Sequence, residues 1–321
     1  MIADRLRAAI LQAAISGKLT DQRPEDGTAT ELLETIKTER QQLEKEGKIK
    51  KQKPLPLMSE EVDLFDVPPA WAWVRLGQLV KYSGSGSTPK GGKAVYVHEG
   101  TMFLRSQNIH NDGLRTQDVA FVSQATVETL GSNTAYPGDL LLNITGASIG
   151  RAAVVPSGFA PSKTNQHILT IRLIDPRLAR YIQTVITSDF GFRQIMQRQN
   201  GGTKEGLNST SALSLPVPVP PVDEQERIVA KLDEVLPLID QLAELERERV
   251  SRPRVRQSNR TRDPPSRHQR QIHQATPRRR HRKRTPRNHQ NRTPATRKGG
   301  QNQEAKAAAT SGYFRITLRY S

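Results

Sequence analysis

Two stretches of the chain resemble the loops with which enzymes bind phosphates or methyl donors. Residues 86–93 read GSTPKGGK, but a phosphate-binding loop needs glycine where Ser87 stands and Ser or Thr where Ala94 follows Lys93. Residues 263–266 read DPPS, which resembles an amino-methyltransferase loop but ends in Ser266. Neither stretch therefore predicts a catalytic site, and we expect the chain not to be an enzyme.

Metal and redox chemistry have little support in the sequence. The chain has no cysteine, and only His98, His110 and His167 precede residue 250, without metal-ligand spacing. We expect each of these histidines to be a surface or hydrogen-bonded residue. No apolar run approaches the roughly 20 residues of a membrane helix, and no secretory signal opens the chain. We expect a cytoplasmic protein.

Polar and cationic side chains in glycine-rich loops and at strand ends are suited to a different chemistry, the reading of DNA. Such side chains can place donors and acceptors against base edges and cations against phosphates. The candidates are Lys90, Lys93, Arg105, Ser106, Gln107, Asn108, Asn143, Thr145, Ser148, Arg151, Lys163, Asn165, Gln166, Lys204, Asn208, Ser209 and Thr210.

Local structural roles compete with DNA contact for several of these residues. Asn143, Thr145 and Ser148 flank the GASIG turn and could satisfy backbone groups of that turn. The run from Asn208 to Thr210 could cap the next turn or helix. The sequence leaves both roles open.

The net charge of +17 is concentrated in the last part of the chain. Of the 49 Lys and Arg residues, 20 lie in 250–321, together with 2 of the 32 Asp and Glu residues. Residues 1–249 therefore carry 29 basic and 30 acidic side chains, a net charge of −1. Any DNA-binding face in residues 1–249 must be a local patch.

The basic tail is best explained as translation in a shifted reading frame. It is almost free of large apolar residues, so we expect it to be disordered. Each residue of 9–56 can be paired, at one constant separation, with a residue of the tail, from Ala9 with Arg262 to Pro56 with Ala309. When the codons of 9–56 are read one base out of frame, they can encode every paired tail residue except Gln274 and Lys283, which pair with Asp21 and Thr30. A phosphate-binding arm would explain only the composition, whereas a second, out-of-frame copy of the segment for 9–56 explains the order.

Helices are predicted at the start of the chain. Apolar spacing favours a helix over 4–16 that stops at Gly17, and another over 30–46 that stops at Gly47. A basic, proline-bearing linker follows.

From residue 67 the pattern changes to short apolar runs separated by Gly, Asn and Asp, which indicates a strand-rich domain. The first predicted strand comes just after Pro68 and Pro69, at 71–77. The others cover 95–97, 102–104, 119–122, 139–145, 151–155 and 167–173. Residues 176–198 favour helix, and the alternating prolines of 215–222 favour an extended segment.

Residues 224–248 form the clearest predicted helix. Their apolar positions step by four, three, four and three, as in a coiled-coil seam, although ordinary core packing would give the same stripe. Pro237 should kink the helix or cost it a backbone hydrogen bond. The seam residues are Ile228, Leu232, Val235, Ile239 and Leu242.

Several passages resemble the specificity subunits of type I restriction–modification systems. They are VPPAWAWVRLGQL (67–79), FLRSQNI (103–109), PGDLLLNITGASIGRAAVV (137–155), NQHILTIRL (165–173) and GGTKEGLNSTSALSLPVPVPPVDEQERIVAKLDEV (201–235). Residues 6–56 resemble the conserved region that follows a recognition helix in this family. The resemblance covers about 1–249.

The resemblance implies an α/β (α+β) architecture. A helical spacer at 1–57 precedes a strand-rich target-recognition domain at 67–222, then a coiled-coil helix at 223–249 and the tail at 250–321. The family has two recognition domains, whereas this chain has one and should read one DNA half-site. The seam residues should dock methyltransferase subunits, with a restriction subunit as a further partner. Half-size subunits can pair as homodimers.

The resemblance also implies that the chain itself binds no cofactor. S-adenosylmethionine, ATP and Mg²⁺ belong to the partner subunits. Two alternatives stay open: a nucleic-acid-binding protein that acts alone through its basic tail, and the recognition part of a fused methyltransferase–nuclease. Deletion of 250–321 separates the first alternative from a recognition subunit, which should keep its sequence preference.

Overall fold

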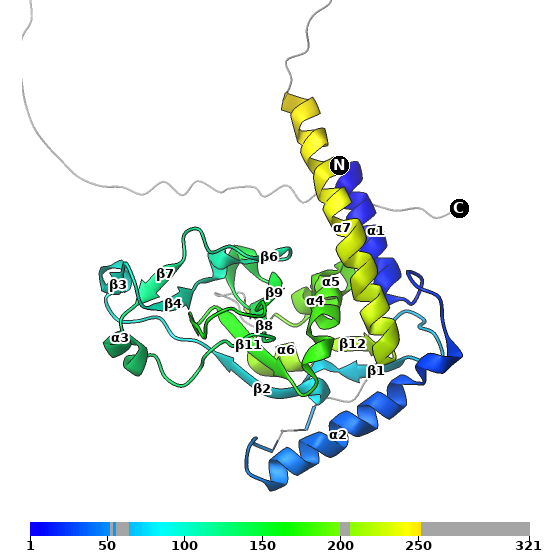
Figure 1. The fold of residues 1–321 in the computed structure, drawn as a ribbon, viewed down its shortest axis with the longest axis horizontal. Coiled ribbons are helices and arrows are strands. Elements are labelled where there is room, and N and C mark those ends of the chain that lie inside the picture. Colours follow the sequence, from blue (N-terminus) through cyan, green and yellow to red (C-terminus); the bar gives the residue numbers. More distant parts are fainter. Residues whose placement is uncertain (52–53, 56–63, 200–205, 252–321) are drawn as a thin grey trace, which may run out of the picture. The chain divides into compact units, whose positions relative to one another are not determined.

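The computed structural model describes residues 1–51, 54–55, 64–199 and 206–251. These residues lie in one compact unit that spans Met1–Arg256. Helices flank a strand-rich region in which two four-stranded sheets hold most of the strands (Figure 1). The expected combination of helices with a strand-rich domain is confirmed. The tail lies outside the described residues, so its predicted disorder and frame change remain predictions.

Two helices from opposite ends of the described chain lie side by side (Figure 1). Helix α1 (Ile2–Ile15) runs antiparallel to α7 (Val222–Ser251), since Ile2 and Ala3 donate backbone hydrogen bonds to Glu246 while residues just after α1 contact the start of α7. Helix α7 therefore packs antiparallel against α1. Helix α7 is continuous through Pro237.

Helix α2 (Ala29–Lys45) leaves this pair and packs on the strand-rich part instead. Thr28 caps its first turn by accepting from the Glu31 backbone N–H, and the Glu31 carboxylate accepts from the Thr28 N–H in return. Further along the helix, Arg40 donates to the backbone carbonyls of Gly77 and Val80. These bonds attach α2 to the chain just before the first long strand.

The start and the end of the strand-rich part are joined by a two-stranded ribbon. Strand β1 (Ala72–Arg75) pairs antiparallel with β12 (Pro216–Val219). Pro216 and Pro218 alternate along β12, so both prolines, which lack an N–H, fall on the same side of the strand. The ribbon places the start of α7 next to the start of the strand-rich part.

The central sheet has the order β2–β11–β8–β9 and is antiparallel throughout. Both faces of strand β8 are buried: Leu140 and Leu142 face one apolar core and Leu141 faces a second. This explains why its sequence is a continuous apolar run and not an alternating one. The strands are β2 (Val80–Ser85), β8 (Leu140–Asn143), β9 (Ala152–Val154) and β11 (Ile168–Leu173).

A second sheet has the order β10–β4–β7–β3, and its β10–β4 pair is parallel. Leu104 from this sheet meets Leu141 and Ile168 of the central sheet in the second core. The strands are β3 (Tyr96–Val97), β4 (Thr101–Leu104), β7 (Ala120–Val122) and β10 (Lys163–Thr164). A small hairpin of β5 (Ile109–His110) and β6 (Gly113–Leu114) and helix α3 (Gln124–Thr129) complete this part.

Helices α4 (Ala179–Thr187) and α5 (Asp189–Gln197) lie between the sheets and the α1–α7 pair. Ser188 ends α4 and caps α5 by accepting from the Gly191 N–H at 3.1 Å. A Cβ at Gly191 would lie 2.1 Å from the carbonyl oxygen of Val185, so only glycine allows this close turn. The short helix α6 (Ser209–Leu213) leads into β12.

Candidate nucleic-acid interface

The strand order brings the ends of several strands to one edge of the central sheet. Ser85 at the end of β2 pairs with Leu169, and Asn143 at the end of β8 pairs with Ile168, so the loops after β2 and β8 and before β11 share this edge. Arg151 lies there too, because its carbonyl accepts from the Asn143 N–H at 2.8 Å. We call this region the loop edge.

The second sheet sends two more strand ends to the loop edge. Strands β4 and β10 run parallel and end at Leu104 and Thr164 in register. Arg105 and Asn165 follow these ends, and Asn143 Nδ2 donates to the Ser106 carbonyl at 2.8 Å. The loops after β2, β4, β8 and β10, predicted from separate sequence passages, are therefore neighbours.

A row of hydrogen-bonded side chains connects three of these loops. Thr88 donates to Gln166 Oε1, and Gln166 Nε2 lies 3.2 Å from His167 Nε2. His167 Nδ1 lies 2.5 Å from Thr145 Oγ1. Thr145 also forms an antiparallel bridge with Gly206, which draws the segment before α6 to the same place.

The loop edge has exposed polar and cationic side chains. Gly86 lets the loop after β2 lie against β10, because a Cβ there would be 1.8 Å from the carbonyl oxygen of Thr164. The Ser87 N–H donates to that oxygen at 3.1 Å. The exposed candidates predicted from sequence are Lys90, Lys93, Gln107, Arg151, Gln166 and Asn208. Thr210 is also exposed but lines a groove beside the start of β2, with Val80 and Lys81.

Arg105, Ser106, Thr145, Ser148 and Ser209 are half-buried. The guanidinium of Arg105 lies 5.6 Å from the centre of the Tyr96 ring and donates to the carbonyl of Asp118 at 2.6 Å. Its Nε has no partner among the described residues. Stacking on Tyr96 restricts the Arg105 side chain before any ligand arrives.

Four predicted contact residues are buried, and three of them, Asn108, Asn143 and Lys163, hold the loops from inside the protein. Asn108 and Asn143 are 2% and 0% exposed. Asn108 Oδ1 accepts from the Arg105 N–H at 2.9 Å, and its Nδ2 donates to the Arg115 carbonyl at 2.8 Å. Lys163 is 7% exposed, and its ammonium donates to the carbonyls of Gly131 and Asn133 and to Thr134 Oγ1. Burial lowers the pKa of Lys163. All three side chains shape the loops and are not available for a base contact.

The remaining candidates are a capping residue, a further buried residue and a residue outside the described part of the chain. Asn208 Oδ1 accepts from the Ser211 N–H at 2.8 Å and so caps α6, which is the local role that the sequence left open. Asn165 is 7% exposed, and its Oδ1 accepts from the His167 N–H at 3.2 Å. Lys204 lies outside the described residues.

The seam of α7 differs from the expectation that it docks partner subunits. Ile228, Leu232 and Ile239 are 0%, 3% and 5% exposed, and the first two share a core with Leu11 and Ile15. These three residues therefore belong to the chain's own core, because α1 occupies the face that a partner would need. Val235 and Leu242 are half-buried.

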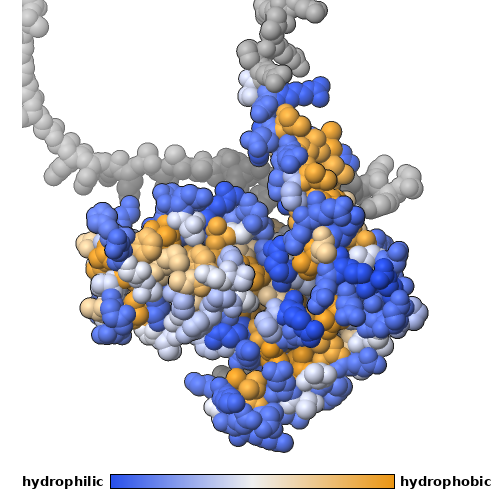
Figure 2. All heavy atoms as spheres, in the orientation of Figure 1, coloured by the Kyte–Doolittle hydropathy of each residue, from blue (hydrophilic) through white to orange (hydrophobic). Residues whose placement is uncertain are grey.

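Other apolar residues of the helix pair are exposed. They gather towards the end of the pair that lies away from the sheets, where Figure 2 shows an apolar patch. Those with 42–63% of their surface exposed are Ile2, Leu6, Leu238 and Leu245.

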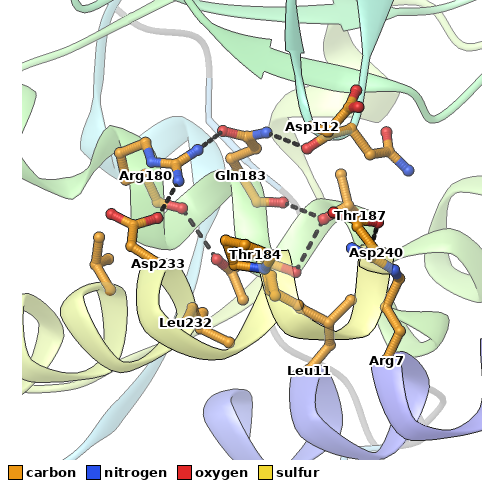
Figure 3. Close-up of a pocket in the computed structure, with 14 residues that line it drawn as sticks. Arg7, Leu11, Asp112, Arg180, Gln183, Thr184, Thr187, Leu232, Asp233 and Asp240 are labelled. Carbon is orange, nitrogen blue, oxygen red and sulfur yellow. Dashed lines mark hydrogen bonds and ion pairs between the residues drawn. The ribbon is translucent and has the colours of Figure 1, made fainter. Parts of the chain in front are cut away.

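A cavity of about 220 Å³ lies where α1, α4 and α7 meet, and both polar and apolar side chains line it (Figure 3). Arg180 pairs with Asp233 at 2.6 Å, and Arg7 pairs with Asp240. Gln183 donates from this junction to the carbonyls of Asn111 and Ala152. These contacts join the sheets to the helix pair and involve none of the loop-edge side chains.

Thr88 belongs to the hydrogen-bonded row but was not predicted from the sequence. Its neighbours Lys90 and Lys93 drew attention through their charge, whereas only the fold brings Thr88 to Gln166. His167 was expected to be a surface or hydrogen-bonded residue, and it is hydrogen-bonded within the row.

Among the described residues, no cluster of three or more acidic, His or Cys side chains could hold a metal ion. None of the described helices is both long and apolar enough to span a membrane.

Comparison with known proteins gives relatives of one kind. The chain is 29% identical over 245 residues to the EcoAI type I restriction enzyme specificity subunit of Escherichia coli, and 27% identical over 245 residues to the EcoEI subunit. Each match covers 74% of this chain and 41% of the relative, so the chain spans about two-fifths of the length of these relatives.

Solved structures of low similarity include the HsdS subunit from Thermoanaerobacter tengcongensis, with a TM-score of 0.40 and 16% identity over 76% of this chain and 53% of that one. A chain from a study of assembly and conformational transition in a type I R-M system has a TM-score of 0.45 and 18% identity over 77% and 53%. Family membership rests on sequence alone. Because residues 68–249 match the type I restriction modification DNA specificity domain, the chain belongs to that family.

Proposed function

We propose that this chain reads one half-site of a DNA sequence for a type I restriction–modification complex, and that it does so through the loop edge. The observation that carries the proposal is the convergence of the loops after β2, β8 and β10 on a hydrogen-bonded polar row, with the loop after β4 beside them. Sequence reading needs donors and acceptors held at fixed positions against base edges. A row that extends from Thr88 to Thr145 supplies such positions.

The charge distribution supports a division of roles between cations that contact phosphates and side chains that contact bases. Residues 1–249 have a net charge of −1, so any attraction of this part of the chain for DNA must come from local cations and not from its overall charge. Lys90, Lys93 and Arg151 are exposed and can neutralise phosphates, which sets affinity and register. Half-buried Arg105 and exposed Gln107 are suited to base contacts.

The chain's helices supply the proposed assembly surface. We infer that methyltransferase subunits dock on the outer face of the α1–α7 pair, that a restriction subunit joins them, and that catalysis, S-adenosylmethionine, ATP and Mg²⁺ belong to those partners. Leu238 and Leu245 are exposed there. The described residues hold one recognition domain, and we propose that two such domains together read a bipartite site, in the cytoplasm.

Selection from a pool of random DNA duplexes tests the proposal. The full chain should enrich one short motif. Arg105→Ala and Gln107→Ala should each relax one position of the motif, at a cost of roughly 1–3 kcal/mol. Lys231→Ala is the control, since Lys231 is exposed on α7 and pairs with Glu234 of the same helix.

The control should select the same motif as the unchanged chain. A bound pool that stays random would refute sequence reading and leave the alternative of a basic tail that binds phosphates without preference. A motif that Arg105→Ala and Gln107→Ala both leave intact would place the reading surface elsewhere on the chain.

A further inference from the structure

The side-chain amide of Gln166 is held at both of its polar atoms, although the residue is exposed. Its Oε1 accepts from the Thr88 hydroxyl, and its Nε2 donates to His167 Nε2 at 3.2 Å. The two partners come from different segments, since Thr88 lies in the loop after β2 and His167 follows Gln166 in the turn before β11. Such a side chain has lost most of its rotamer freedom before any ligand binds.

The bonds of the row also define the protonation of His167. With the amide nitrogen of Gln166 as the donor, His167 Nε2 accepts and the ring proton of the neutral imidazole lies on Nδ1. Nδ1–H then donates to Thr145 Oγ1 at 2.5 Å. This assignment makes the row directional, from the Thr88 hydroxyl through Gln166 and His167 to Thr145.

The amide of Gln166 keeps one donor and one acceptor free for a ligand. An amide has two N–H donors and two oxygen lone pairs, and the described contacts use one of each. An adjacent donor and acceptor match only one base edge in the major groove. Adenine offers an acceptor at N7 beside a donor at N6, whereas guanine offers two acceptors, and the pyrimidines offer a single polar group.

We propose that Gln166 is a specificity-determining residue that recognises adenine at one position of the half-site. Its free N–H donates to adenine N7 and its oxygen accepts from the N6 amino group. Thr88, His167 and Thr145 are positioning residues that hold the amide in this orientation. The inference rests on the proposed function and adds the identity of one base.

The first test compares motifs selected by the full chain and its variants from random duplexes. The unchanged chain should select a motif that contains adenine at one position, and Gln166→Ala should lose roughly 5- to 150-fold discrimination there and nowhere else. Gln166→Glu should shift the preference towards cytosine, whose N4 amino group can donate to a carboxylate. Gln124→Ala is the matched control, because Gln124 is exposed on α3 and its side chain donates to Glu128 within the same helix.

The second test addresses the N7 contact directly. Replacing the selected adenine by 7-deazaadenine removes the acceptor and should weaken binding by the unchanged chain, but should cost Gln166→Ala nothing further. Thr88→Ala should lose part of the discrimination and Thr88→Ser should restore it, because only the hydroxyl is needed. Equal thermal unfolding midpoints show that the variants are folded.

The outcomes separate this inference from the proposed function. If the unchanged chain selects no motif, both fail. If it selects a motif that Gln166→Ala preserves, or if 7-deazaadenine costs both proteins the same, the proposed function stands and the role of Gln166 is overturned.

Discussion

Glu224 connects three separate parts of the chain, and its removal should destabilise the fold measurably. The residue is 1% exposed in the first turn of α7. Its Oε2 accepts from Trp71 Nε1 at 2.7 Å, and its Oε1 accepts from Thr20 Oγ1 at 3.2 Å and from Gln22. The carboxylate therefore joins the segment after α1, the start of the strand-rich part and the start of α7.

The cost of Glu224→Ala follows from which donors stay buried. Thr20 and Gln22 can turn towards water, but the Trp71 indole is 6% exposed and its N–H would be left without a partner. An unsatisfied buried donor costs about 1–3 kcal/mol. Loss of a carboxylate at a helix N-terminus adds about 0.3–1 kcal/mol. We expect the free energy of unfolding to fall by about 3 kcal/mol.

Urea unfolding of the full chain, followed by tryptophan fluorescence, measures this effect. Glu226→Ala is the control, because Glu226 is exposed in the same turn of α7, and its loss should cost less than about 0.5 kcal/mol. Trp71→Phe should reduce the cost of Glu224→Ala, since the indole donor is then absent. Equal unfolding free energies for Glu224→Ala and Glu226→Ala would refute the linking role.

Three further predictions follow from individual contacts. Gly86→Ala should lower the unfolding free energy by about 1–3 kcal/mol, because its Cβ would overlap the Thr164 carbonyl; an unchanged melting temperature would contradict this. Lys163→Met should destabilise the chain but leave the selected DNA motif intact, and an altered motif would restore Lys163 as a base contact. The Arg227 hydrogen bond lowers the pKa of Asp26 in the folded chain. The stabilisation by Asp26 should therefore be present above about pH 4 and be lost at lower pH, so urea unfolding of Asp26→Asn and of the unchanged chain should converge in acid.

Much of the secondary structure follows from the sequence because apolar spacing and glycine stops determine it locally. The helices predicted over 4–16, 30–46 and 224–248 match α1, α2 and α7 closely. Strand β2 was missed because its last residues are Ser83, Gly84 and Ser85, which carry no apolar alternation. Pairing with β11 makes this segment a strand, and that pairing is a tertiary contact.

The candidate site was harder to predict than the fold, since polar residues in loops serve two purposes. Asn108, Asn143 and Lys163 have the side chains of DNA contacts, yet each is buried and shapes the loops. No local pattern distinguishes a lysine that binds backbone carbonyls from one that binds phosphate. The seam of α7 gave a similar difficulty, because periodicity predicts a buried stripe but not whether the partner is Leu11 of the same chain or another subunit.

The most direct test of sequence reading by the loop edge is the ratio of affinities for selected and scrambled duplexes, measured at several salt concentrations. A chain that ends at Arg256 should bind both duplexes more weakly with a smaller salt slope, since each lost phosphate contact lowers the slope by about 0.9, but the ratio should be unchanged. Arg105→Ala and Gln107→Ala should lower the ratio and leave the slope nearly constant. The account is contradicted if the truncation abolishes the discrimination while both variants preserve it.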